Sequence, residues 1–393
     1  MSCDFFSSHG DFTLTVRPDQ IRGTAPSPPG CDPAAVPQVI REALLAPSTS
    51  PKLESVVVPG DRVAIALDPA APGWSPILRE MLACLRDGGV ASVDVIAPEP
   101  CDGLPEGATL HVHDPADREG MAYLATTSLD SRVYLNRRLV DADVVLALGR
   151  VSNDPALGTR GPWNAVFPDL GDAPRQYSTR PRDPGKADFE RAAAGKEALE
   201  VNWLLGSCFQ VGVIPGVTGV AKVLAGDPRT LEGLANRRHR ELWTIKSPEP
   251  VGLFVGGVGE SGTLASWDDF ALAIRAGQRF LSPGGTLVIV ARFGHELGPA
   301  LQRVVGHAES AKSARALKGA EAEPDFEAAR ALRAALDSCR ICLLSDWPDE
   351  VVTDLGMVAL DSPKDVQNVV TKAETCLIVS RAEQVRGKVK PDS

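Results

Sequence analysis

The sequence of 393 residues has no long hydrophobic run and no excess of basic residues. No stretch approaches the ~18 consecutive apolar residues of a membrane-spanning helix, so we expect no membrane insertion. The N-terminal residues MSCDFFSSHGDF lack the basic and apolar segments of a signal peptide. The formal net charge of -10 disfavours electrostatic binding to nucleic acid or to anionic lipid. These features predict a cytoplasmic protein without a nucleic-acid or membrane partner.

Histidine is scarce, with six residues in the whole chain. His111 and His113 alternate in TLHVHD, so an expected strand would place both on one face, where they could hold a metal. A third ligand is not obvious, and solvated histidines on an edge strand are the alternative.

Cysteine is spread thinly, with eight residues scattered along the chain, which is typical of reduced thiols rather than of a disulfide framework. Cys339 and Cys342 form a lone CxxC that runs into an apolar, strand-like segment. No second ligand pair accompanies them, and a redox motif would normally open a helix. We therefore interpret both as core thiols.

Short apolar runs alternate with amphipathic helical stretches along most of the chain. Residues 62–68, RVAIALD, read as a buried strand, and the helix after it has one apolar face made of Ile77, Leu78, Met81, Leu82 and Leu85. The same alternation restarts at GLFVGG after the proline-containing segment KSPEPVG. This rhythm predicts an α/β protein with parallel or mixed sheets flanked by helices.

The alternation of strand-like and helical segments is interrupted at KSPEPVG, which divides the chain into two domains. We predict an N-terminal α/β domain over residues 1–245, a linker over 246–252 and a C-terminal α/β domain over 253–393, with a ligand cleft between the domains. Residues 171–190 are rich in proline, glycine and charge, and predict a long exposed loop.

Two strand ends carry acidic residues that could act in a site. Asp68 follows an expected strand, where it could bind a ligand or cap the next helix. Glu260 lies in GGVGESGT, residues 256–263, which resembles a phosphate-binding loop but lacks its lysine. We interpret GGVGESGT as a flexible strand-to-helix loop at the carboxyl edge of a sheet, where ligands of such sheets bind.

The order of several segments resembles the nickel-pincer lactate racemases. The segments are PGDRVAIALDPAAP, SPILREMLACLRDGGV, VDVIAPEPCDG, HDP, VYLNRRLVDADVVLALGRV, GTRGPWNAVFPDL, VGVIPGVTGVAKVLAGD, VGLFVGG and LSPGGTLVIVARFGHELG. They cover most of residues 55 to 305. The resemblance implies the two-domain fold of that family. It also implies a nickel pincer nucleotide tethered to a lysine, which accepts hydride from a 2-hydroxy acid while two histidines exchange protons.

The family's catalytic positions hold other side chains in this sequence. The arginine position holds Ala71, two histidine positions hold Cys101 and Asp154, and two lysine positions hold Asn164 and Glu260. The family's nickel-binding histidine falls in residues 171–190, which contain no histidine. Asparagine cannot form the lysine tether, and neither cysteine nor aspartate replaces an imidazole pair. The resemblance therefore predicts a divergent member with a degenerate active site and without the cofactor.

Three hypotheses follow. The first is a lactate-racemase-like protein without nickel-pincer catalysis that binds a small ligand, such as a hydroxy or sugar acid, or a protein partner. The second is an enzyme, a racemase or epimerase of 2-hydroxy acids with a rebuilt site in which Arg160 holds an anion. The third is an ordinary nickel-pincer racemase whose residues align differently. Candidate site residues are Asp68, Cys101, Asp154, Arg160, Asn164 and Glu260.

Overall fold

The chain divides into two compact units. The computed structural model describes residues 1–23, 25, 27–32, 34–49, 51–172, 187–247, 249–306, 315–387 and 389. The central unit comprises Pro29–His239, and the terminal unit combines Met1–Pro28 with Arg240–Ser393. Of the predicted loop 171–190, residues 173–186 lie outside the described residues. Within the described part, no helix is long and apolar enough to cross a membrane.

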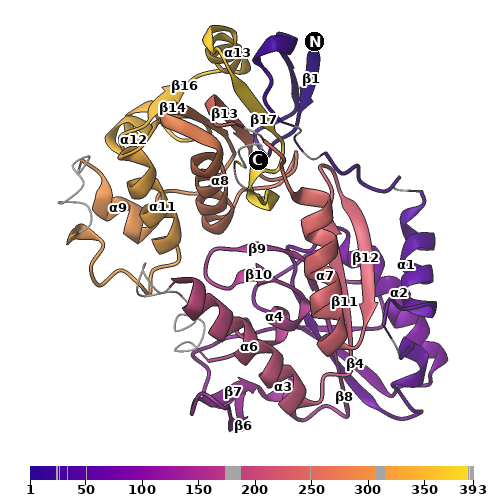
Figure 1. Cartoon of the computed structure of the whole chain (residues 1–393). Helices are drawn as coiled ribbons and strands as arrows, with labels where there is room; N and C mark the ends of the chain where they lie inside the picture. Colours follow the sequence, from indigo (N-terminus) through magenta and orange to yellow (C-terminus); the bar gives the residue numbers. More distant parts are fainter. Residues whose placement is uncertain are drawn as a thin grey trace. The chain divides into compact units, whose positions relative to one another are not determined.

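The N-terminal 28 residues belong with the C-terminal segment, which differs from the boundaries expected from the sequence. Strands β1 (Ser2–Phe5) and β2 (Phe12–Thr15) form an antiparallel hairpin. Phe5 and Leu14 of this hairpin are fully buried in the same core as Leu253 of the terminal unit. Figure 1 shows the N-terminal hairpin beside β17 and α13. The hairpin is therefore part of the terminal unit because its apolar face completes that core.

The central unit is built on a six-stranded mixed sheet of order β12-β11-β8-β3-β4-β5, in which only β12 runs antiparallel to its neighbour. Two smaller hairpins, β6–β7 and β9–β10, accompany it. The strands are β3 (Arg62–Leu67), β4 (Ser92–Ala97), β5 (Thr109–Val112), β6 (Met121–Thr126), β7 (Arg132–Asn136), β8 (Val144–Arg150), β9 (Ser152–Asp154), β10 (Gly158–Arg160), β11 (Phe209–Pro215) and β12 (Val220–Gly226). The helices are α1 (Val36–Leu45), α2 (Trp74–Asp87), α3 (Arg137–Val140), α4 (Pro162–Val166), α6 (Ala187–Leu205) and α7 (Pro228–Trp243).

Alternation along the strands gives the six-stranded sheet two different faces. On one face, Ile65 and Leu146 pack against α1 and α2 in a single hydrophobic core. Figure 1 shows α1 and α2 on one side of this sheet and α4 and α6 on the other. The predicted apolar face of α2 is confirmed, since all five of its residues are at most 4% exposed.

The terminal unit contains a five-stranded parallel sheet of order β16-β15-β14-β13-β17. Its strands are β13 (Val251–Gly257), β14 (Leu281–Val290), β15 (Arg340–Leu344), β16 (Val358–Leu360) and β17 (Cys376–Val379). Its helices are α8 (Trp267–Phe280), α9 (Pro299–Val304), α11 (Phe326–Leu336), α12 (Asp349–Asp354) and α13 (Pro363–Lys372). Cys342 on β15 is buried in the core, and the thiol of Cys339 lies 3.3 Å from the carbonyl oxygen of Ala335.

Candidate functional site

The central sheet changes direction of winding between β3 and β8, which lie side by side. The connection after β3 runs through α2 on one face, whereas α4, after β8, lies on the other. Gly149 and Gly212 allow this close approach, because a Cβ atom on Gly149 would meet the Cα atom of Pro162 at 2.9 Å. Ligands of open α/β sheets bind at the carboxyl ends of the strands at such a switch point.

Five charged residues meet at this point, and we call them the switch-point cluster: Asp68, Arg150, Asp154, Arg160 and Asp169. Arg160 is central, because its guanidinium group pairs with Asp169, lies 3.5 Å from Asp154 and lies 3.6 Å from Asp68. Three of the residues singled out from the sequence therefore come together.

Asp68 is held by both arginines and by backbone groups. Its Oδ2 atom lies 3.4 Å from Nε of Arg150, and the backbone N–H of Arg150 donates to the same oxygen at 3.3 Å. Its Oδ1 atom accepts from the backbone N–H of Ala70 at 3.1 Å. Burial opposes ionisation of Asp68, but Arg150, Arg160 and these N–H groups hold its pKa below the usual range. Asp68 is therefore a buried carboxylate anion that fixes the ends of β3 and β8.

Asp154 organises the short β9–β10 hairpin. Its Oδ1 atom accepts from the backbone N–H groups of Ala156 and Leu157 at 2.8 and 2.7 Å, and its other oxygen faces Arg160. This Asx-type turn brings Arg160, at the end of β10, back toward β3 and β8. The acid thus serves the local turn and the cluster together.

Asp169 is the acid of the cluster whose pKa is raised. Burial raises its pKa to about 6; Arg160 opposes this shift, while the charges of Asp68 and Asp154 add to it. With all five side chains ionised, three carboxylates face two guanidinium groups, so the cluster carries one net negative charge. Protonation of Asp169 would make the cluster neutral.

Sequence reasoning missed Arg150 and Asp169. Arg150 is the last residue of β8, so its place at a strand's carboxyl end was a usable signal. Asp169 follows α4 in a loop, and nothing in the linear pattern connects it with Arg160, nine residues earlier.

The side chain of Asn164 is hydrogen-bonded within α4 and is not part of the switch-point cluster. Its side chain is fully buried in α4, where Oδ1 accepts from the backbone N–H of Gly161 at 2.9 Å. It therefore caps the first turn of α4.

Cys101 is half-buried beside the core on the α2 side of the sheet. Burial raises the pKa of its thiol, and the charges of Asp102 and Glu99 add to this shift. Neither residue has the geometry of an acid–base pair with Asp154.

Glu260 belongs to a separate ion cluster in the terminal unit. It follows β13, and its Oε2 atom lies 3.6 Å from Nη1 of Arg381, which follows β17. Arg381 has φ of 56°, a left-handed conformation uncommon for residues other than glycine, and its Nε donates to Glu383 at 2.6 Å. This cluster occupies the switch point of the five-stranded sheet, between β13 and β17.

The two histidines of TLHVHD have different surroundings, because β5 ends at Val112 and His113 lies just after it. His113 is buried, with Nε2 2.9 Å from the carbonyl oxygen of Gly171 and Nδ1 3.1 Å from the side-chain amide of Asn136. Burial lowers its pKa. His111 lies 3.0 Å from Asp94. Within the described residues, no group of three or more His, Cys, Asp or Glu side chains has a metal-binding arrangement.

Comparison with solved structures agrees with this architecture. The lactate racemase apoprotein of Thermoanaerobacterium thermosaccharolyticum superposes with a TM-score of 0.76 at 14% identity, over 98% of this chain and 99% of that one. The chain has the lactate racemase fold. A structural-genomics protein of Thermotoga maritima matches with a TM-score of 0.66 at 11% identity, over 93% of this chain and 100% of that one. No family model and no curated protein sequence matches the chain.

Two positions that the resemblance assigns to cofactor chemistry hold side chains with other contacts. The position that the resemblance assigns to the tethering lysine holds Asn164, which has no amine and is bonded within α4. The position of one catalytic histidine holds Asp154, whose oxygens are used by the β9–β10 turn and by Arg160. We therefore derive no chemistry from that cofactor.

Proposed function

We propose that this protein uses the lactate racemase fold to bind a small hydroxy or sugar acid at the switch-point cluster, without a nickel pincer nucleotide. The observation that supports this most is the convergence of Asp68, Asp154 and Arg160 at the carboxyl ends of β3 and β8. The buried Nε atom of Arg160 also has no hydrogen-bond partner within the described residues, so it has a donor available for a ligand.

Protonation of Asp169 is the proposed switch for anion binding. With Asp169 ionised, the three carboxylates of the cluster outnumber its two guanidinium groups and repel an anion. With Asp169 protonated, a ligand carboxylate can share Arg160 and Arg150, whose side chain is 25% exposed. Because the pKa of Asp169 is raised to about 6, binding should strengthen as the pH falls through that value.

Calorimetric titration with D-lactate, L-lactate, gluconate and glucuronate at pH 5.5 and pH 8 tests the proposal. We expect binding at the lower pH, loss of binding in Arg150→Gln, and little difference between the two pH values in Asp169→Asn. The matched control is Arg132→Gln, because Arg132 is exposed on β7, outside the cluster. A panel without any binding, or binding that Arg150→Gln leaves unchanged, would contradict the proposal.

Racemisation or epimerisation of a 2-hydroxy acid with a rebuilt site is the second candidate. It is favoured by the contrast between Asp68, whose pKa is lowered, and Asp169, whose pKa is raised to about 6. Neighbouring acids with separated pKa values can divide the roles of base and acid. Deuterium uptake at C2 of lactate in heavy water, abolished by Asp169→Asn, would support this candidate; no uptake would exclude it for lactate.

A further inference from the structure

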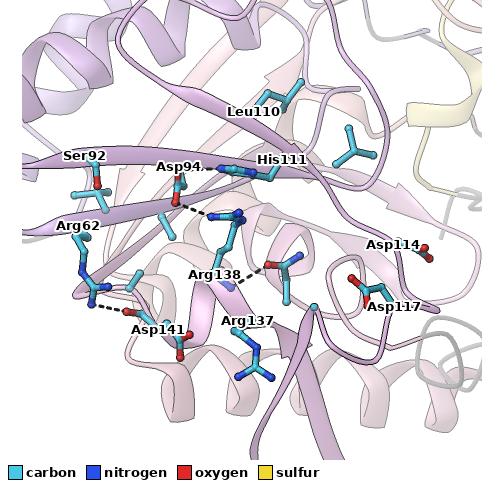
Figure 2. A pocket seen from close by; sticks show the side chains of 16 residues that line it. Arg62, Ser92, Asp94, Leu110, His111, Asp114, Asp117, Arg137, Arg138 and Asp141 are labelled. Atoms are coloured by element: carbon cyan, nitrogen blue, oxygen red, sulfur yellow. Dashed lines mark hydrogen bonds and ion pairs between the residues drawn. The ribbon is translucent and has the colours of Figure 1, made fainter.

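A pocket of the central unit lies apart from the switch-point cluster. Sixteen residues from β3, β4, β5, α3 and the adjoining loops line a cavity of about 650 Å³ (Figure 2). This volume is within the ~300–1,000 Å³ range of small-molecule sites. None of the five cluster residues lines the pocket.

Polar residues in the middle of two strands mark the floor of this pocket. Asp94 on β4 and His111 on β5 pair at 3.0 Å, and Asp94 also lies 3.5 Å from Nη1 of Arg138. Strands of a parallel sheet are normally apolar on both faces, because helices cover them. The charged side chain between the buried Val93 and Val95 therefore indicates a hydrated hollow rather than a packed face.

Arg138 is the lining cation best placed to receive a ligand. Arg62 is held by Asp143 through contacts of 3.0 and 3.1 Å, and Arg137 donates to two backbone carbonyl oxygens. Arg138 has one 3.5 Å side-chain contact, with Asp94, and half of its side chain is exposed. Its guanidinium group retains donors for a carboxylate.

Two acids lie at the other end of the pocket. Asp114 and Asp117 each use Oδ1 to accept a backbone N–H, at 2.9 and 3.0 Å, and both residues are exposed. Figure 2 shows them at the end away from Arg62, with Arg138 between. The second carboxylate oxygen of each acid is directed to no cation that the structure describes.

The charges of the lining residues favour a ligand that carries one positive and one negative group. It includes three arginines and four aspartates, so with His111 neutral it carries one net negative charge and disfavours a multiply charged anion. The sixteen residues include no Phe, Tyr or Trp, so the pocket offers no platform for stacking a base or a sugar ring. We infer that this pocket binds a small zwitterion, an amino acid in chemical class, with its carboxylate on Arg138 and its ammonium group at Asp114 and Asp117.

The test is a calorimetric titration of the full chain at pH 7.5 with zwitterions of increasing length: glycine, β-alanine, 4-aminobutyrate and 6-aminohexanoate. Hexanoate and hexylammonium serve as singly charged controls. We expect one zwitterion to bind at least tenfold more tightly than either control, because each lost charge-assisted hydrogen bond corresponds to roughly a tenfold change in affinity.

Variants then locate the ligand. Arg138→Gln and Asp114→Asn should each weaken the preferred zwitterion roughly tenfold, whereas the exposed control variants Arg132→Gln and Asp102→Asn should not change its affinity. Both pocket positions are exposed, so the variants should fold, and the melting temperature checks this. Equal affinity for zwitterion and hexanoate, absence of binding, or binding unchanged in both pocket variants would overturn the inference.

Discussion

Arg160 is the residue on which the switch-point cluster depends. It is 13% exposed and contacts three carboxylates, so its removal leaves buried negative charges without compensation. Arg160→Gln should lower the free energy of unfolding at pH 7.5 by about 3–5 kcal/mol. Urea denaturation followed by circular dichroism measures this change.

The matched control is Arg132→Gln, an exposed arginine whose loss should change stability by less than about 0.5 kcal/mol. An effect of Arg160→Gln as small as that of the control would mean that the cluster contributes no net stability.

The raised pKa of Asp169 predicts how the stability of the protein changes with pH. Its folded-state pKa is about 6, above the ~3.9 of an unfolded aspartate. The folded state therefore binds more protons between these values, and stability attributable to Asp169 falls as the pH rises from about 4 to 6. Asp169→Asn should remove this loss, so that the variant gains stability relative to the parent as the pH rises from about 4 to 6, with little further change up to pH 8.

The comparison uses denaturation curves of both proteins at each pH, because the difference cancels the titration of other groups. Asp68, whose pKa is lowered, acts in the opposite direction in both proteins. A constant difference between parent and variant across the pH range would contradict the raised pKa.

Part of the candidate site was accessible from the sequence. Asp68 was singled out by its position at the end of an apolar strand, Asp154 by its place at a histidine position of the resembled family, and Arg160 as a residue that could hold an anion. Pairing partners were not accessible, because Asp169 reaches Arg160 only through the fold of the α4 turn. The same turn gives Asn164 a structural role that its position in the linear sequence does not reveal.

The element that positions the cluster is α4, which lies directly on β8. In Gly149→Ala, the added methyl group would meet the Cα atom of Pro162 at 2.9 Å and Cβ of Asp68 at 3.5 Å. The Cα atom of Pro162 belongs to the backbone of α4, so the whole helix must shift to make room. We expect the free energy of unfolding to fall by about 1–3 kcal/mol.

Gly195→Ala provides the matched control for this substitution. Gly195 lies in α6 with open space around its Cα hydrogens, so alanine should be neutral or stabilise the helix by up to about 1 kcal/mol. Thermal and urea denaturation of both variants decide the question. A Gly149→Ala protein as stable as Gly195→Ala would show that α4 does not need this close approach.

Elements with a regular apolar period were predictable. The helix α2 and the strands β3, β13 and β15 match the expected segments within a few residues. The antiparallel strand β12 and the N-terminal hairpin were not predicted. β14 begins at Leu281, which pairs with Val251, and its register is irregular before Thr286.

At the scale of the whole molecule, the fold matches that of a lactate racemase, whereas the side chains at the family's catalytic positions differ. At 14% identity the chain has the lactate racemase fold over 98% of its length, and a shared fold does not by itself imply a shared function. The proposed loss of nickel-pincer chemistry involves few side chains. Coexpression with the enzymes that make the cofactor should yield protein without stoichiometric nickel by elemental analysis; bound nickel would contradict this expectation.

The division into two units predicts how the chain behaves when it is cut after α7. Residues 29–243 contain the complete six-stranded sheet and its core, so this fragment should fold cooperatively. Residues 244–393 lack the hairpin whose Phe5 and Leu14 are buried in the terminal core, each contributing about 1.5–3 kcal/mol. The fragment 244–393 should therefore be unstable alone and regain a cooperative melting transition when residues 1–28 are fused to its N-terminus. If 244–393 alone melts at the same temperature as the fusion, the hairpin is not part of that core in solution.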